Sequence, residues 1–170
     1  MLEFVGRIYW LMLPAILGGI CNMVWMKLPV LKSLQKPMDR GKKLKDGRRV
    51  FGDNKTWKGF LGMIVFTAAF AGLFGVFPFW GGALLGLAYV LAELPNSFIK
   101  RRMGVTPGKS GGFVQTFFDQ TDSVIGYVLF LPIVYPATWQ EIAGILVLAP
   151  ITHYIANVLL YFAGLKKQKG

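Results

Sequence analysis

The sequence predicts an all-α membrane protein with five transmembrane helices, its N-terminus outside the cell and its C-terminus inside. Three observations predict this: the chain is apolar, its apolar residues form long runs, and its basic residues are concentrated in every second segment between those runs. Of 170 residues, 54% are hydrophobic and 16% are charged, whereas a soluble domain carries about 25% charged residues. A charge deficit combined with long apolar runs is typical of a chain embedded in a bilayer.

Each apolar run is close to the roughly 20 residues that a spanning helix needs. The expected spans are Ile8 to Met26, Gly59 to Phe77, Gly81 to Ile99, Ser123 to Trp139, and Ile142 to Leu165. The short connections at 78–80 and 136–140 contain Pro and Trp but no Lys or Arg. Because Trp is enriched at membrane interfaces, both fit tight turns at the bilayer surface.

The distribution of basic residues predicts the orientation. The net charge of +11 is concentrated in residues 27–58, 100–109 and 166–169. With five spans these segments fall on one side, which the positive-inside rule assigns to the cytoplasm. We therefore expect a multi-pass protein of the cell membrane, a single domain over residues 1–170 with cytoplasmic loops at 27–58 and 100–122. In this setting the basic segments fit membrane lipids or a phosphorylated substrate, not nucleic acid.

The end of the first loop, residues 46–59, is one candidate binding site. Its cations can neutralise phosphate oxygens, its threonine adds a hydroxyl donor, and its glycines let the backbone approach a ligand. The candidate residues are Arg48, Arg49, Asp53, Lys55, Thr56 and Lys58. The alternative is a solvated stretch attracted to anionic lipid, which explains the Lys and Arg but not the interleaved Gly, Asp and Trp.

Polar residues close the third span. Glu93, Asn96 and Lys100 are spaced i, i+3, i+7 and share a face if the helix continues past Pro95. A carboxylate inside a span is costly and usually faces a cavity or a partner. The alternative is a Glu93 paired with Asn96 or a basic residue to hold helices together.

Two acids stand at the mouth of the fourth span. Asp119 and Asp122 are spaced i, i+3, and carboxylates at that spacing suit Mg²⁺, which also binds substrate phosphates. The alternative is helix N-capping, in which Asp is favoured. In the fifth span, His153 and Asn157 are one turn apart, and an interhelical hydrogen bond is the simpler interpretation there.

Three segments together resemble the CDP-archaeol synthase family, which is related to the phosphatidate cytidylyltransferases. They are residues 46–59, Glu93-Leu-Pro-Asn-Ser-Phe-Ile-Lys-Arg-Arg102, and Asp119-Gln-Thr-Asp122. The stretch from Ser97 to Arg101 also resembles the signature of the wider group. The resemblance runs in order from about residue 37. The sequence departs from the family pattern just before this point. Family members have a Gly-rich stretch between the first span and the segment that corresponds to Pro37-Met38-Asp39, whereas this chain has the segment from Lys27 to Lys36 there.

The resemblance implies an Mg²⁺-dependent transferase of phospholipid biosynthesis, in which CTP and a lipid phosphate give a CDP-lipid and pyrophosphate. The lipid stays open between the archaeal di-geranylgeranyl glycerol phosphate and a diacyl lipid, as does the oligomeric state. Asp119 and Asp122 would hold the metal and form the catalytic group with Lys100 and Arg101. Lys55, Lys58, Lys100 and Arg101 would neutralise the phosphates, and Glu93, Asn96 and Ser97 would order the metal shell or the headgroup.

Two alternatives remain. A CTP-dependent lipid kinase would share the substrates but transfer the γ-phosphoryl group. A non-enzymatic membrane subunit or small transporter would place polar residues near the midplane, whereas the polar groups here gather at one membrane face.

Overall fold

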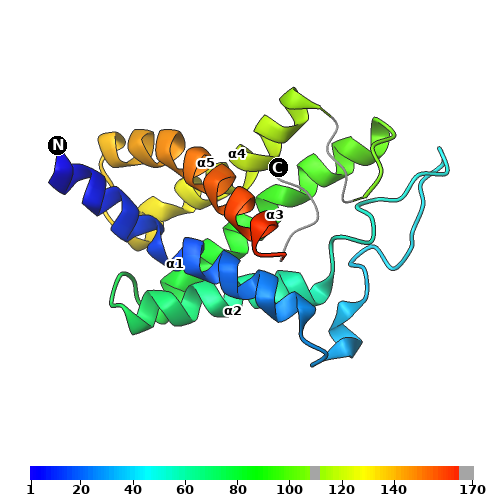
Figure 1. Ribbon diagram of the computed structural model, residues 1–170, viewed down its shortest axis with the longest axis horizontal. Coiled ribbons are helices and arrows are strands. Elements are labelled where there is room, and N and C mark those ends of the chain that lie inside the picture. The colour runs from blue at the N-terminus through cyan, green and yellow to red at the C-terminus, as the bar shows by residue number, and fades with distance from the viewer. Residues whose placement is uncertain (108–111, 165–170) are drawn as a thin grey trace.

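The computed structural model describes residues 1–107 and 112–164. Figure 1 shows them as a bundle of helices with one long loop. The helices are α1 (Leu2–Lys27), α2 (Trp57–Leu73), α3 (Phe79–Arg102), α4 (Phe113–Val134) and α5 (Trp139–Phe162), with a short 3-10 helix, η1, at Lys32–Gln35. The described residues contain isolated bridges but no strand. The predicted all-α class is therefore confirmed.

Four of the helices in the described residues are long and apolar enough to cross a membrane, namely α1, α3, α4 and α5. The remaining helix, α2, is apolar but has 17 residues, which is the lower limit for a span. Its predicted end at Phe77 is wrong, because the chain leaves the helix after Leu73. Gly75 follows with a φ of +67°, a left-handed conformation that glycine adopts without strain.

The predicted fourth span also had wrong boundaries. It begins at Phe113 rather than Ser123 and ends at Val134. Trp139, expected in a turn, is the first residue of α5, because Thr138 forms a capping box with Glu141. The basic residues Lys109, Lys166, Lys167 and Lys169 lie outside the described residues.

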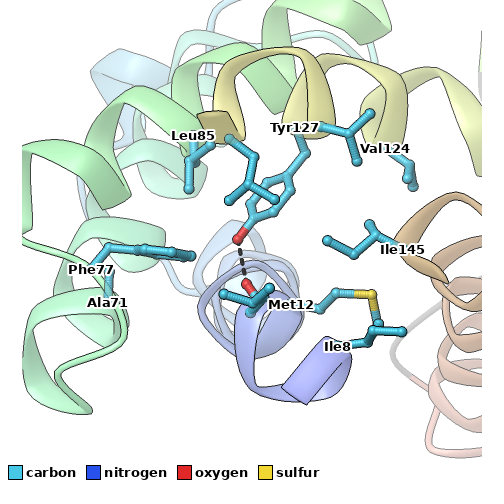
Figure 2. Close-up of a cluster of buried hydrophobic side chains, with 11 residues drawn as sticks. Ile8, Met12, Ala71, Phe77, Leu85, Val124, Tyr127 and Ile145 are labelled. Carbon is cyan, nitrogen blue, oxygen red and sulfur yellow. Dashed lines mark hydrogen bonds between the residues drawn. The ribbon is translucent and has the colours of Figure 1, made fainter. Parts of the chain in front are cut away.

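Consecutive helices pack on one another from α1 to α5, and α1 also contacts α5. Small residues let the backbones approach closely: a Cβ added at Gly86 of α3 would lie 2.9 Å from the Ile64 Cα of α2. Close approach through glycine is typical of membrane helix packing. In the apolar core the Tyr127 hydroxyl donates a 2.6 Å hydrogen bond to the Leu11 carbonyl (Figure 2).

The polar end of the bundle is formed by the end of α3, the start of α4 and the long loop, residues 28–56. Figure 1 shows this loop, in cyan, extending beside the end of α3. The functional residues expected from the sequence lie at this end.

Candidate active site

Asp119 and Asp122 lie inside α4 rather than at its start. Gly112 is the N-cap of the helix, so N-capping does not explain either carboxylate. Both face α3, where Asn96 Nδ2 donates hydrogen bonds to Asp119 Oδ1 and to Asp122 Oδ2, each 2.7 Å long. Because one amide nitrogen donates to both side chains, an oxygen of Asp119 and an oxygen of Asp122 lie close to each other.

Gln115, to which the sequence did not point, fixes the orientation of that amide. Its Nε2 donates to Asn96 Oδ1 at 2.6 Å, and the residue is buried. Gln115, Asp119 and Asp122 are spaced i, i+4, i+7 and share one face of α4. This spacing becomes informative only once the helix is known to begin before residue 115.

Lys100 supplies the cation of this group. Its Nζ lies 2.7 Å from Asp119 Oδ1 and 2.6 Å from Asp119 Oδ2, and its side chain is 12% exposed. Because α3 remains helical past residue 100, Glu93, Asn96 and Lys100 do share a face. We refer to the following residues as the acidic-pair cluster: Asn96, Lys100, Gln115, Asp119 and Asp122.

A second ion pair joins the long loop to α3. Lys55 Nζ donates to Glu93 Oε2, and the two side chains are 20% and 26% exposed. Glu93 of the third helix therefore has a basic partner, as expected if it pairs with a basic residue to hold helices together. The same pair also lines a cavity, so it is in reach of a ligand there.

That cavity has a volume of about 300 Å³ and is lined by residues from all five helices. At the loop end its lining is polar and includes Asn54, Lys55 and Glu93. Farther inside the bundle the lining is apolar and includes Met12 and Ile145. A cavity with one polar end and an apolar interior fits an amphiphile whose charged group stays at the polar end.

Asp39 organises the long loop. Its side chain, 1% exposed, accepts hydrogen bonds from Arg49 Nε at 3.2 Å and from the backbone N–H groups of Phe51 and Gly52 at 3.0 and 2.9 Å. Burial opposes ionisation, but these donors outweigh it and hold the pKa of Asp39 well below its usual range. Arg49 also pairs with Asp53 at 2.7 Å, so both of these candidate ligands have partners within the loop.

Arg48 and Arg102 fasten the loop to the end of α3. Arg102 Nη1 lies 2.6 Å from Asp46 Oδ2, and Arg102 Nη2 donates to the Arg49 carbonyl. Arg48 Nη1 donates in turn to the Arg102 carbonyl. The backbone N–H of Arg48 and the Arg102 side chain lower the pKa of Asp46. Arg48 thus contacts the scaffold, not the acidic-pair cluster.

Lys58 and Thr56 hold α1 and α2 together. Lys58 is 0% exposed; its Nζ donates to the Leu28 carbonyl at 2.7 Å and lies 4.8 Å from the centre of the Trp25 ring. Thr56 is the N-cap of α2 and accepts from the Gly59 N–H at 3.2 Å. Both side chains are engaged in packing and capping.

Arg101 and Ser97 are buried on α3, 4% and 5% exposed. Within the described part of the chain, Nε and Nη1 of Arg101 are buried without a hydrogen-bond partner. Buried donors without acceptors are uncommon in native structures and call for an explanation. An anion that binds between α3 and α4 would satisfy them.

The residues that the structure describes contain no group of three or more His, Cys, Asp or Glu side chains that could hold a metal ion. Asp119 and Asp122 offer oxygen atoms only, which is the donor set of a hard cation, and Lys100 already places a positive charge against Asp119. Mg²⁺ is commonly bound by one or two carboxylates together with water and substrate phosphates. The acidic pair therefore fits an Mg²⁺ ion that a phosphate substrate helps to hold.

The apolar helices around this charged site define a multi-pass integral membrane protein with a candidate phosphate-handling centre. The chain belongs to the CDP-archaeol synthase family: the CarS-like CDP-archaeol synthase model matches residues 1–169. This confirms the resemblance drawn from the three motifs.

Curated relatives and a solved structure agree with this assignment. The CDP-archaeol synthase of Pyrococcus furiosus is 32% identical over 163 residues, which cover 90% of each chain. That of Methanococcoides burtonii is 34% identical over 161 residues, covering 78% of this chain and 89% of the relative. The solved structure is described as an intramembrane enzyme for archaeal membrane lipids biosynthesis; it is 25% identical, with a TM-score of 0.64, covering 88% of this chain and 92% of that one.

Proposed function

We propose that this protein is a membrane cytidylyltransferase that transfers CMP from CTP to a lipid phosphate. An oxygen of the lipid phosphate attacks the α-phosphorus of CTP. The bond from that phosphorus to the bridging oxygen breaks, and pyrophosphate leaves with the electron pair. Membership of the family supports this reaction, and the single structural observation that carries it is the Asn96 amide shared between Asp119 and Asp122.

In this proposal Asp119 and Asp122 hold Mg²⁺. When bound, the ion supplies positive charge to the phosphate oxygens. Asn96 keeps the two carboxylates facing one point, and Gln115 keeps Asn96 turned toward them. Transfer between phosphates depends mainly on positioning and charge neutralisation, and these side chains are already arranged for it.

The cations nearest the acidic pair bind the phosphates. Lys100 exchanges its contact with Asp119 for a phosphate oxygen, since the incoming substrate brings its own negative charge. Arg101 offers the buried N–H groups that have no acceptor within the described residues. Lys55 faces the cavity from the loop side and serves the triphosphate of CTP. The other basic-loop candidates have structural roles: Arg48, Arg49 and Asp53 support the loop, and Thr56 and Lys58 hold α1 and α2 together.

The lipid chains occupy the apolar part of the 300 Å³ cavity, and the lipid phosphate extends beyond its polar end toward the acidic pair, where Lys100 and Arg101 bind it. The basic residues of the long loop support a cytoplasmic position for this end of the bundle, where CTP is available. The N-terminus then lies outside.

Labelled CTP tests the reaction. The purified protein is incubated with Mg²⁺, a lipid phosphate and CTP carrying ³²P at either the α or the γ position. A cytidylyltransferase puts only the α label into lipid, whereas incorporation of the γ label would support the lipid kinase and overturn the proposal. The assay is run with di-geranylgeranyl glycerol phosphate and with a diacylglycerol phosphate, so that the preferred lipid is identified at the same time.

A further inference from the structure

The opposite face of α4 carries a polar contact that the proposed reaction does not use. Asn157 Nδ2 of α5 donates a hydrogen bond to Gln120 Oε1 of α4 at 3.2 Å. Both residues are more than nine-tenths buried, with exposures of 4% and 6%. In apolar surroundings a side-chain amide is costly unless it is hydrogen-bonded, so this pair specifies how the two helices meet.

Gln120 lies between the two proposed metal ligands in the sequence. Successive residues of a helix are about 100° apart around its axis, so Gln120 points toward α5 while Asp119 and Asp122 point toward α3. Asn96 holds α4 from one side and Asn157 holds it from the other. The rotation of α4 about its axis is therefore fixed by hydrogen bonds on both faces.

The same stretch of α5 also forms a wall of the cavity. His153, Ala156, Asn157 and Leu160 all line it, at the i, i+3, i+4, i+7 spacing of one helix face. Asn157 thus touches the substrate cavity as well as the helix that carries the acidic pair. A shift of α5 would change both at once.

We propose that Asn157 is a positioning residue: through its hydrogen bond to Gln120 it sets the rotation of α4 and keeps Asp119 and Asp122 aimed at the metal and the substrate phosphates. This inference rests on the proposed function. It adds a requirement that the acidic-pair cluster alone does not impose, namely that α5 must be docked correctly for the cation to bind.

The test measures Mn²⁺ binding by electron paramagnetic resonance on purified protein, with a non-hydrolysable CTP analogue present. Gln120→Met and Asn157→Leu remove the hydrogen bond and retain most of the side-chain volume. Each is expected to weaken Mn²⁺ binding about tenfold, in the range usual for residues that orient metal ligands. Because the two substitutions break one contact, the double variant should bind Mn²⁺ no more weakly than either single variant. Ile155→Ala, on the exposed side of α5, is the matched control and should bind as the wild type does.

A purely structural role predicts a different result. The thermal unfolding midpoint would fall in both variants while the Mn²⁺ affinity of the folded protein stayed unchanged, and that outcome would overturn the inference. If Asn157→Leu does not fold, Gln120→Met alone carries the test. If the wild type does not bind Mn²⁺, or if Asp119→Asn does not weaken that binding, both this inference and the metal assignment are overturned. The labelled-CTP assay tests the reaction separately.

Discussion

The ammonium group of Lys100 lies within 2.7 Å of both carboxylate oxygens of Asp119. Lysine on α3 and aspartate on α4 thus hold the two helices together at the point where the proposed metal and phosphates would bind. In the proposed reaction, a phosphate oxygen would replace Asp119 as the partner of Lys100, and the cation would replace Lys100 as the partner of Asp119. The pair therefore preserves the site's geometry in the absence of substrate.

Asp119→Asn and Asp122→Asn should each reduce CMP transfer at least about 100-fold, because even the loss of a residue that only orients a metal ligand costs about 10- to 100-fold. The neutral amide retains the size of the side chain, so the protein should still elute as a folded species in detergent. Transfer of the α label measures the effect. Ile125→Ala, on an exposed position of the same helix, is the control. Activity above about a tenth of wild type in either variant would contradict the metal-binding role.

The topology predicts that the turn between α4 and α5 is outside and the long loop inside. A reporter inserted at Ala137 should be accessible from outside the cell, and one at Lys42 only from the cytoplasm. The short helix α2 makes a third insertion informative: at Gly75 the reporter should also appear outside. Finding Gly75 and Lys42 on the same side would mean that α2 does not cross the bilayer.

The order of the long loop should depend on the charge of Asp39. A carboxyl whose folded-state pKa is lowered stabilises the fold above its unfolded pKa, about 3.9, and loses that contribution as the pH falls through the folded value. The loop should therefore be equally protected from pH 8 to pH 5 and lose protection only in strong acid. Hydrogen exchange of the Phe51 and Gly52 amides, corrected for intrinsic pH dependence, measures this directly.

Asp39→Asn should speed exchange at both amides at neutral pH, since a hydrogen bond to a charged group contributes about 1.5–3 kcal/mol. Lys45→Ala, an exposed change in the same loop, should have no effect. Unchanged exchange in Asp39→Asn would mean that the carboxylate does not organise the loop.

The sequence predicted the number of helices because each is a long apolar run, and it predicted the faces of α3 from helical spacing. It misplaced the start of α4 because Gln115, Asp119, Gln120 and Asp122 interrupt the apolar pattern there. Those residues are helical because their polar groups meet partners on α3 and α5, which hydropathy does not record. Likewise, nothing local distinguishes Lys55 from Lys58: one faces the cavity and the other is buried only because α1 supplies a carbonyl and an aromatic ring.

Lys55 and Arg101 should serve different substrates. Lys55→Ala should raise the KM for CTP more than that for the lipid phosphate, because Lys55 approaches the cavity from the long loop. Arg101→Ala should do the reverse, because Arg101 is buried in the last turn of α3, where a spanning helix would meet the lipid headgroups. Each lost charge-assisted contact is worth about 1.5–3 kcal/mol, or about 10- to 150-fold. Equal effects of both variants on both substrates would indicate one shared phosphate cluster.

Lys55, just before the N-cap of α2, and Lys58, in its first turn, should separate catalysis from stability. Lys58→Met retains the apolar stem but leaves the Leu28 carbonyl without its donor and removes the cation from the Trp25 ring. A hydrogen bond from a charged group contributes about 1.5–3 kcal/mol, so its loss should lower the unfolding midpoint in detergent while the KM for CTP changes little. Lys55→Met should give the opposite balance, a larger rise in KM with a smaller loss of stability, because the Lys55–Glu93 pair is partly exposed. If Lys58→Met instead raised the KM for CTP without loss of stability, Lys58 would be a phosphate ligand after all, and its contact with Leu28 would have to break when CTP binds.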